Sequence, residues 1–418
     1  MPAFVMTLVS TWYGGILGVS EFSTTYGISN WVIFGLPYYV FGIVFALLVA
    51  KRARRLEVKS LPEIMVKDYG VTAGRIASIW VLLLANPAPY ILTLGILVNF
   101  FFNIPLNLGI VLGALFSLIY IYRGGFSAVV NTDKLQFMFM FVGFFLILIV
   151  LSINYMNPVE LWKSLPDSHR SLTGGNSLAY ILVWFFIGSW TLVDPGFHQR
   201  VYATTTPRVA QKGILVAVGF WFIFDIMTTF TGLYAFSYLP SSTIASQAFL
   251  SLGSSILPIG LQGLFFTGIL ATVMSTLDSN ALISGITLGK DLLGSYGRLK
   301  KYSVDSMVKG GMLIVLIVGI LMAIRIPSVI DLWYTFGTIA LPALLMPTLF
   351  SIFQRPVSRQ CARLNLILAP IMSLLWLVFG KDVNMRYYFD LEPFYPGLFT
   401  SIVLMMIFNS TKGTIHEN

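Results

Sequence analysis

The stretch ILATVMSTLDSNALIS, residues 269–284, decides the fold because it carries polar side chains inside a long apolar segment. Hydroxyl side chains recur in it at the spacing of one helix face: Thr272, Ser275, Thr276 and Ser279. In such a helix they can bond back to the carbonyl four residues earlier. Asp278 follows, and an acid inside a membrane span is costly unless it is paired or serves an ion path. The pattern favours a cation role, with helix back-bonding as the alternative.

The composition of the whole chain places this helix in a lipid bilayer. The 418 residues are 57% hydrophobic and only 10% charged, with a mean hydropathy of +0.83. A soluble protein carries about 25% charged residues. In lipid, backbone polar groups must be satisfied within helices or closed barrels. The long apolar segments predict an all-α polytopic membrane protein, and the net charge of +9 is then a matter of topology rather than of nucleic-acid binding.

About twelve segments are long enough to cross some 30 Å of hydrocarbon. They are residues 3–26, 30–50, 72–100, 106–122, 135–155, 177–197, 213–238, 257–289, 310–324, 328–354, 364–380 and 394–409. Between them, 21 of the 26 lysines and arginines fall on one side. The positive-inside rule makes that side cytoplasmic and puts both termini there. We expect an integral protein of the plasma (inner) membrane, without a cleavable signal peptide.

Two spans carry helix-breaking residues at corresponding places. The first contains Gly14 and Gly15, and the sixth contains Gly188 with Ser189 before a Pro-Gly pair. Broken helices free carbonyls that can point at a cation, whereas small residues also serve close helix packing. Opposite orientations of spans 1–5 and 6–10 fit an inverted repeat: residues 1–155, residues 156–355, and two final helices with a tail in 356–418.

A third weak point lies in span 3, in the run ANPAPY. Asn86 there is followed by two prolines, which free backbone carbonyls in the middle of the membrane. Asn86 is predicted either to face a solute or to hold a kink by interhelical hydrogen bonds. Asp133, before span 5, is predicted as a helix cap on its own chemistry. His198, close to basic residues, is expected at the cytoplasmic surface.

Five runs in this order resemble the sodium:solute symporter family, which has the LeuT-type inverted-repeat fold. They are TWYGG (11–15), SLPEIMVKDYG (60–70), YRGGFSAVVNTDKLQ (122–136), HQRVYATT (198–205) and LPIGLQGLFFTGILATVMSTLDSN (257–280). The resemblance covers most of the chain, from span 1 to the end of span 8. Relatives have a further helix before span 1, which this chain starts without.

The resemblance implies a Na⁺ site between spans 1 and 8 as the coupling-ion site. Its ligands would be Leu8, Thr11, Thr272, Ser275 and Thr276, with Ser10 and Tyr13 as alternative carbonyl donors in span 1. Asp133 would help bind a second Na⁺ or lie on the release path. The solute would lie against spans 1, 3 and 6, at Trp12, Gly14, Gly15, Asn86, Ser189, Trp190 and Thr191.

The function expected from the resemblance is Na⁺-coupled import of a small organic solute by alternating access. The solute would be a sugar, amino acid, vitamin or carboxylate, and the absence of a basic residue in the middle of these spans disfavours a strongly anionic one. A Na⁺-independent channel or a solute sensor on the same core is the alternative. A membrane enzyme is disfavoured, because Cys361 is the single cysteine and the three histidines are scattered.

Overall fold

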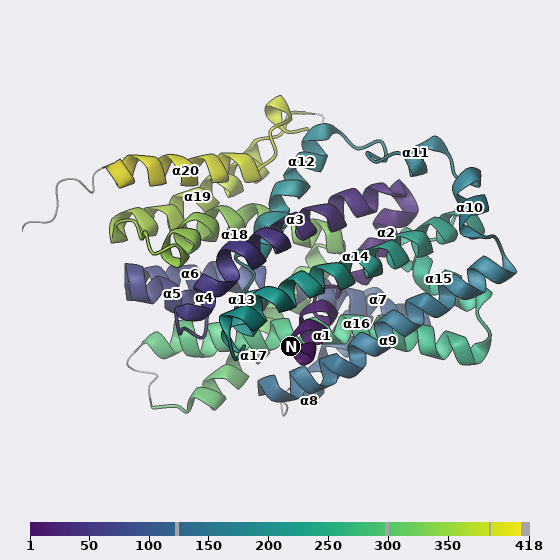
Figure 1. Cartoon of the computed structure of the whole chain (residues 1–418), viewed down its shortest axis with the longest axis horizontal. Helices are drawn as coiled ribbons and strands as arrows, with labels where there is room; N and C mark the ends of the chain where they lie inside the picture. The colour runs from purple at the N-terminus through teal and green to yellow at the C-terminus, as the bar shows by residue number, and fades with distance from the viewer. Residues whose placement is uncertain (122–124, 297–300, 384–385, 411–418) are drawn as a thin grey trace, which may run out of the picture.

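The computed structural model describes residues 1–121, 125–296, 301–383 and 386–410. Most of its helices run along the long axis of the molecule (Figure 1). The described part of the chain contains no strand, only an isolated bridge between Lys381 and Tyr387. The predicted all-α architecture is confirmed. Part of the predicted motif 122–136 lies outside the described residues.

The helices of the first 155 residues are α1 (Pro2–Ser10), α2 (Ile16–Tyr26), α3 (Leu36–Val44), α4 (Ala50–Arg55), α5 (Leu61–Tyr69), α6 (Val71–Leu84), α7 (Ala88–Phe102), α8 (Leu106–Ile121) and α9 (Gly125–Asn154). Those that follow are α10 (Pro158–Ser164), α11 (Asp167–Arg170), α12 (Leu178–Ile187), α13 (Pro195–Tyr202), α14 (Pro207–Tyr238), α15 (Ala248–Ile256), α16 (Ile259–Ile286), α17 (Val304–Arg325), α18 (Val329–Ile352), α19 (Arg359–Phe379) and α20 (Phe394–Ser410).

All twelve predicted segments are helical, but the number of membrane crossings stays a prediction. Within the described residues, nine helices are long and apolar enough to cross a bilayer. The remaining segments are the shorter apolar helices α8 and α20 and the broken pair α1 and α2. Helices α8 and α20 are shorter than the roughly 20 residues that hydrocarbon thickness demands, and the first span is divided between two short helices. The third and sixth spans count among the nine although each is also broken.

The three predicted breaks are confirmed, each for a local reason. The first span is interrupted between Ser10 and Ile16, around its glycine pair. The third is interrupted at residues 85–87, where proline removes a backbone donor. In the sixth span α12 gives way to a 3₁₀ turn over Gly188–Leu192, and α13 then starts at Pro195.

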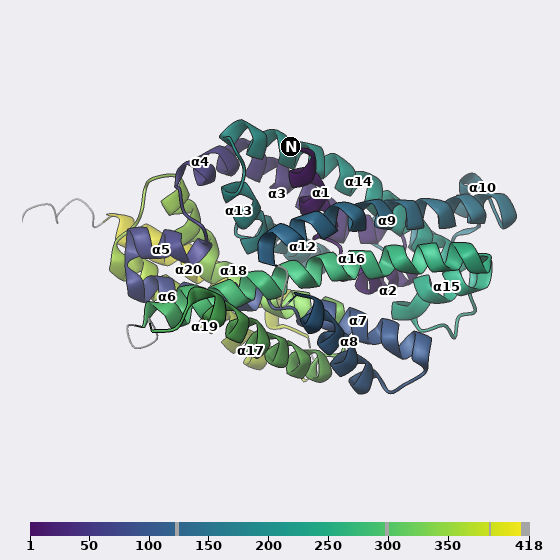
Figure 2. The ribbon, with the colours of Figure 1, turned by 90° about the horizontal axis from the view of Figure 1, so that it is seen from below.

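Helices α9 and α16 lie side by side and position the site (Figure 2). Gly143 on α9 and Gly268 on α16 meet at their point of closest approach, where a Cβ on Gly268 would lie 2.7 Å from the Phe139 carbonyl. Small residues allow such close helix contact in membranes. This contact brings the inner part of α9 against the hydroxyl face of α16.

The ends of the molecule separate in the way that the charge bias predicts. Helix α4, which contains the basic run after span 2, and helix α5 lie at one end of the long axis, and α10, α11 and α15 lie at the other (Figure 1). The grouping agrees with the predicted sides of the membrane. The orientation itself stays a prediction.

Candidate functional site

The break between α1 and α2 lies directly against α16. A Cβ on Gly14 would overlap the Thr276 side chain and the ring of Tyr90, and one on Gly15 would overlap the indole of Trp333. Ser275 Oγ and Ser10 Oγ lie within hydrogen-bond distance, at 2.9 Å, across the same contact. The two glycines therefore serve close packing, and that packing brings the unwound backbone to the hydroxyl face.

The unwound segment leaves carbonyls without hydrogen-bond partners. The amides of Thr11 and Trp12 donate to Thr7 and Val9, at 3.3 Å each. In the described chain no donor reaches the carbonyls of Leu8, Ser10 or Thr11. Unpaired carbonyls at a broken helix are suited to a cation such as Na⁺. The geometry is compatible with both Leu8 and Thr11, and with the alternative that uses Ser10.

The four hydroxyls of α16 are buried, but they have different partners. Thr272 Oγ1 donates to the Gly268 carbonyl at 2.7 Å, and Thr276 Oγ1 donates to the Thr272 carbonyl at 3.2 Å. Ser275 Oγ instead lies 2.7 Å from Asp133 Oδ1. Ser279 Oγ accepts a hydrogen bond from Arg200 at 2.8 Å. Back-bonding thus accounts for the two threonines, while the two serines make tertiary contacts.

Asp133 is a buried interior residue of α9 and not a helix cap. Helix α9 begins at Gly125, about ten residues before the predicted apolar segment 135–155, so Asp133 lies inside the helix. The Asp133 carboxylate accepts hydrogen bonds from Thr7 and from Ser275. It connects α1, α9 and α16 at the inner side of the break.

Arg200 is the functional candidate that sequence reasoning missed, because it falls among the residues counted as cytoplasmic. Its side chain is buried and lies 3.6 Å from Asp133 Oδ2. It also donates to Thr7 Oγ1 at 3.2 Å and to the Gly196 carbonyl at 3.3 Å. The sequence signal that could have indicated its burial is its position shortly after the Pro-Gly break in span 6.

His198 corrects a second expectation. It is fully buried instead of lying on the surface. Its ring nitrogens lie 2.9 Å from the Leu192 carbonyl and 2.9 Å from the Tyr202 hydroxyl. These contacts join α13 to the 3₁₀ turn that precedes it. His198 is buried because α13 packs inside the protein after the break.

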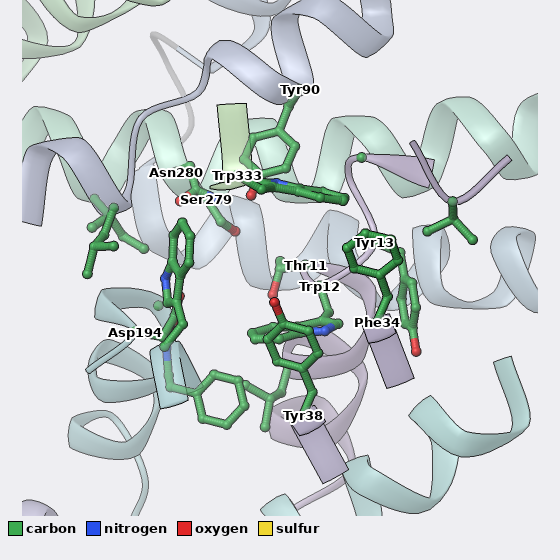
Figure 3. A pocket seen from close by; sticks show the side chains of 18 of the residues that line it. Thr11, Trp12, Tyr13, Phe34, Tyr38, Tyr90, Asp194, Ser279, Asn280 and Trp333 are labelled. Carbon is green, nitrogen blue, oxygen red and sulfur yellow. The ribbon is translucent and has the colours of Figure 1, made fainter. Parts of the chain in front are cut away.

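A cavity of about 90 Å³ opens beside the break of span 1 (Figure 3). Its lining residues are Leu8, Thr11, Trp12, Tyr13, Gly15, Val19, Asn30, Phe34, Tyr38, Leu84, Tyr90, Trp190, Asp194, Gly196, Phe197, Arg200, Asp225, Ser279, Asn280, Ile283 and Trp333. All three broken spans contribute to it. A concave, largely apolar pocket with a few polar groups is typical of a small-molecule site.

Three of the seven predicted solute residues line this cavity: Trp12, Gly15 and Trp190. The other four are not among its lining residues: Gly14, Asn86, Ser189 and Thr191. Gly14 packs on Thr276. Asn86 Oδ1 accepts the Ala88 amide at 2.9 Å at the start of α7, and Thr191 Oγ1 donates to the Gly188 carbonyl at 3.0 Å. Their hydrogen bonds hold the breaks of spans 3 and 6.

Several lining residues were not predicted as solute contacts. Tyr38, Tyr90 and Trp333 come from three different spans, and a single sequence has no signal that joins them. Asp194 was noted only as part of a helix break. It caps α13, accepting the Phe197 amide at 2.7 Å.

Two further acids are buried in the spans. Asp225 lines the cavity and accepts a hydrogen bond from Tyr39, a partner that the sequence could not name. Asp278 is fully buried, and neither carboxylate oxygen has a hydrogen-bond partner in the described part of the chain. No three of the described His, Cys, Asp and Glu residues form a group that could hold a metal ion.

The broken helices, the buried oxygen cluster and the cavity beside them define a membrane transporter with a LeuT-type fold. The chain belongs to the sodium:solute symporter family, whose model matches residues 4–368. The predicted family and fold are confirmed.

Two relatives of known name are bacterial. Sodium/proline symporter 2 of Staphylococcus saprophyticus is 22% identical over 320 residues, which cover 72% of this chain and 62% of that protein. The sodium/glucose cotransporter of Vibrio parahaemolyticus is 23% identical over 409 residues, covering 86% of this chain and 73% of that protein. The chain thus spans 62% of the length of the proline symporter.

Solved structures show the same fold. A Na⁺-coupled sialic acid symporter in a substrate-bound outward-open state matches with a TM-score of 0.72 and 20% identity, over 98% of this chain and 95% of that chain. Mhp1, a nucleobase-cation-symport-1 family transporter in a closed conformation, matches with a TM-score of 0.60 and 12% identity, over 98% and 92%. At these identities the likeness concerns the fold alone.

Proposed function

We propose that the protein is a Na⁺-coupled symporter that imports a small organic solute by alternating access. The observation that carries this proposal is the contact between the break of span 1 and the hydroxyl face of α16, next to a cavity that the same break lines. An ion held at this contact stabilises the break against α16 and so completes the solute pocket. By linkage, solute and Na⁺ then raise each other's affinity by the same factor.

The residues present fit a Na⁺ ion. Hard cations prefer oxygen ligands, and the break supplies the unpaired carbonyls of Leu8 and Thr11. Facing them are the side chains of Ser275 and Thr276 and an oxygen of Thr272. Rotation of the Thr276 hydroxyl away from its own helix would free it for the ion, at the cost of one back-bond.

Asp133 has two candidate roles: it binds a second Na⁺, or it contacts Na⁺ on the release path to the cytoplasm. Its carboxylate is already balanced by Arg200 at 3.6 Å. A Na⁺ at Asp133 therefore has to share the carboxylate with Arg200 or displace it, whereas a release step needs only a transient contact. The Na⁺ stoichiometry of uptake separates the two.

The solute pocket of the proposal is the cavity, with Trp12, Gly15 and Trp190 as wall residues. Gly14, Asn86 and Thr191 shape the breaks next to the cavity. Ser189, whose buried hydroxyl has no hydrogen-bond partner in the described residues, is kept as a solute contact. The protein lies in the plasma (inner) membrane with both termini in the cytoplasm. Residues 1–155 and 156–355 form the two repeats, followed by the final helices.

The test is uptake into proteoliposomes with a panel of solutes, with and without an inward Na⁺ gradient. Accumulation that depends on Na⁺ supports a symporter, and the Thr276→Val variant should need at least ten-fold more Na⁺. The matched control is Thr267→Val on the same helix, because Thr267 is exposed and bonds back to Gly263 at 2.7 Å. Uptake indifferent to Na⁺ would contradict symport, and ion conductance without solute would identify a channel.

A further inference from the structure

The cavity beside the break is walled by aromatic rings to an unusual extent. Eight of its 21 lining residues are aromatic, and they come from both halves of the chain. Trp12 with Tyr38 lies on one side of the open space, and Trp333 with Tyr90 lies on the opposite side (Figure 3). All four keep part of their surface accessible inside the helix bundle. A solute in this space is therefore sandwiched between π systems.

The indole of Trp12 is held so that one side stays open to the cavity. Trp221, which does not line the cavity, packs on Trp12 with ring centroids 5.1 Å apart and planes tilted by 30°. Tyr38 and Phe197 contact Trp12 in edge-to-face geometry at 5.0 and 5.4 Å. Packing on several sides fixes the ring, which lowers the entropy cost of binding to its open side.

The charges around the cavity are unbalanced toward the negative. Asp194 and Asp225 both line it, and neither forms an ion pair within the described residues. Arg200 is the one basic residue among the described lining residues, but it is paired with Asp133 and hydrogen-bonded to Ser279. An unpaired carboxylate in the membrane interior is costly and points to a cationic partner.

Three neutral hydrogen-bond donors of the wall are engaged elsewhere. Thr11 Oγ1 donates to the Thr7 carbonyl at 2.7 Å, and Asn280 Nδ2 donates to the Thr276 carbonyl at 3.0 Å. Asn30 Nδ2 donates to Thr229 at 2.9 Å, whereas Asn30 Oδ1 is buried without a hydrogen-bond partner in the described part of the chain. This oxygen can accept from a solute, while a carboxylate in the cavity would find no unpaired cation.

We propose that the solute is a small organic cation, with its ammonium group between the indoles of Trp12 and Trp333 and beside Asp194. A cation over an aromatic face is attracted by the ring quadrupole, most strongly by tryptophan and when water is excluded. This inference rests on the proposed symport function and deepens it by naming the class of solute.

The test compares charged probes with their neutral isosteres on the full-length protein in nanodiscs. Choline and tetramethylammonium are measured against 3,3-dimethyl-1-butanol and neopentane-type alcohols, with glucose and proline as further probes, by thermal shift and direct binding in Na⁺ and in K⁺. We expect the cations to bind in Na⁺ at least ten-fold more tightly than the neutral isosteres. Equal binding of the two, or binding of glucose or proline but of no cation, overturns the proposal.

Two variants locate the cation. Asp194→Asn removes the charge and keeps a side chain that caps a helix equally well, and it should weaken choline binding at least ten-fold. Its control is Asp331→Asn, an exposed acid at the start of α18. Trp333→Leu should weaken choline binding ten-fold and leave the neutral isostere nearly unchanged, whereas Tyr334→Leu next to it should not change choline binding, because Tyr334 does not line the cavity.

The failure of this inference can be told apart from the failure of symport. If Na⁺ alone stabilises the protein and another solute is taken up with Na⁺, then symport stands and the organic cation is excluded. If choline binds equally well in Na⁺ and K⁺ and its uptake ignores the Na⁺ gradient, then the solute class stands and Na⁺ coupling is excluded.

Discussion

Arg200 and Asp133 form an ion pair in the interior of the protein, with 3.6 Å between Arg200 Nη2 and Asp133 Oδ2 and with both side chains buried. The pair joins α13 to α9, and through Thr7 and Ser279 it also reaches α1 and α16. The inner half of the broken first span is thereby tied to the three helices around it. In the proposed transport cycle, with both termini in the cytoplasm, opening of the cytoplasmic side would have to separate these contacts.

Breaking this pair from one side should be far more harmful than removing both charges. Arg200→Met or Asp133→Asn leaves the other group without its partner, and loss of one partner of a buried pair costs about 3–5 kcal/mol. We expect each single variant to lower the unfolding temperature strongly and the double variant to recover part of the loss. A thermal-denaturation double-mutant cycle measures the coupling. Additive effects of the two substitutions would show that the pair contributes no coupling.

Gly14 should be intolerant of even a methyl group. Gly14→Ala places a Cβ onto Thr276 and Tyr90 and pushes the break away from α16. We expect the Na⁺ concentration for half-maximal uptake to rise at least ten-fold. Gly263→Ala on α16 is the control, because nothing lies within 4 Å of its Cβ position; alanine there should stabilise the helix by up to about 1 kcal/mol. Unchanged Na⁺ dependence in Gly14→Ala would show that the break of span 1 is not part of the Na⁺ site.

The hydrogen bond that Asn86 accepts in the turn before α7 can be tested against its predicted role as a solute ligand. Asn86→Ser keeps a side-chain oxygen for the Ala88 amide, so the solute concentration for half-maximal uptake should change by less than about three-fold. Asn86→Leu removes this hydrogen bond, which costs about 1 kcal/mol of stability. A ten-fold loss of solute affinity in Asn86→Ser, with normal thermal stability, would favour direct solute contact.

Glu63, in the connection between spans 2 and 3, should make the stability of the folded protein depend on pH. Burial works to raise the pKa of Glu63, but hydrogen bonds from the Lys290 side chain at 2.5 Å and the Lys59 amide at 2.7 Å outweigh it and hold the pKa below its ordinary value. The folded protein therefore binds this proton less tightly than the unfolded chain. The stabilisation is present above the unfolded pKa of about 4.3 and is lost as the pH falls through the lower folded pKa.

The Glu63→Gln variant should accordingly be less stable than the parent at pH 7, by about 0.5–1 kcal/mol for a pair at the protein surface. The difference should shrink as the pH falls below the unfolded pKa of about 4.3 and vanish below the lowered folded pKa, where the carboxyl is protonated in both states. Melting curves across this pH range measure it. The control is Glu57→Gln, at an exposed acid on the same connection, which should show no such pH-dependent difference in stability. An equal effect in both variants would show that the contacts of Glu63 do not cause the difference.

The sequence by itself determined the features that depend on neighbouring residues and on the solvent. Apolar runs of membrane length predict helices, because a bilayer leaves no other partner for the backbone. Gly14, Gly15 and the proline runs predict the breaks, because they weaken or interrupt local hydrogen bonding. The spacing of Thr272, Ser275, Thr276 and Ser279 predicts a shared helix face in the same way.

Only the tertiary structure decided which of these features meet. Arg200 looked like one more basic residue at the membrane surface, yet the fold of α13 buries it against Asp133. Trp12 and Trp333 belong to the first and tenth predicted spans, yet they lie across one cavity. The physical reason is that helix packing between distant segments determines which residues contact a buried charge or ring. Helix formation and helix breaks depend instead on residues close together in the sequence.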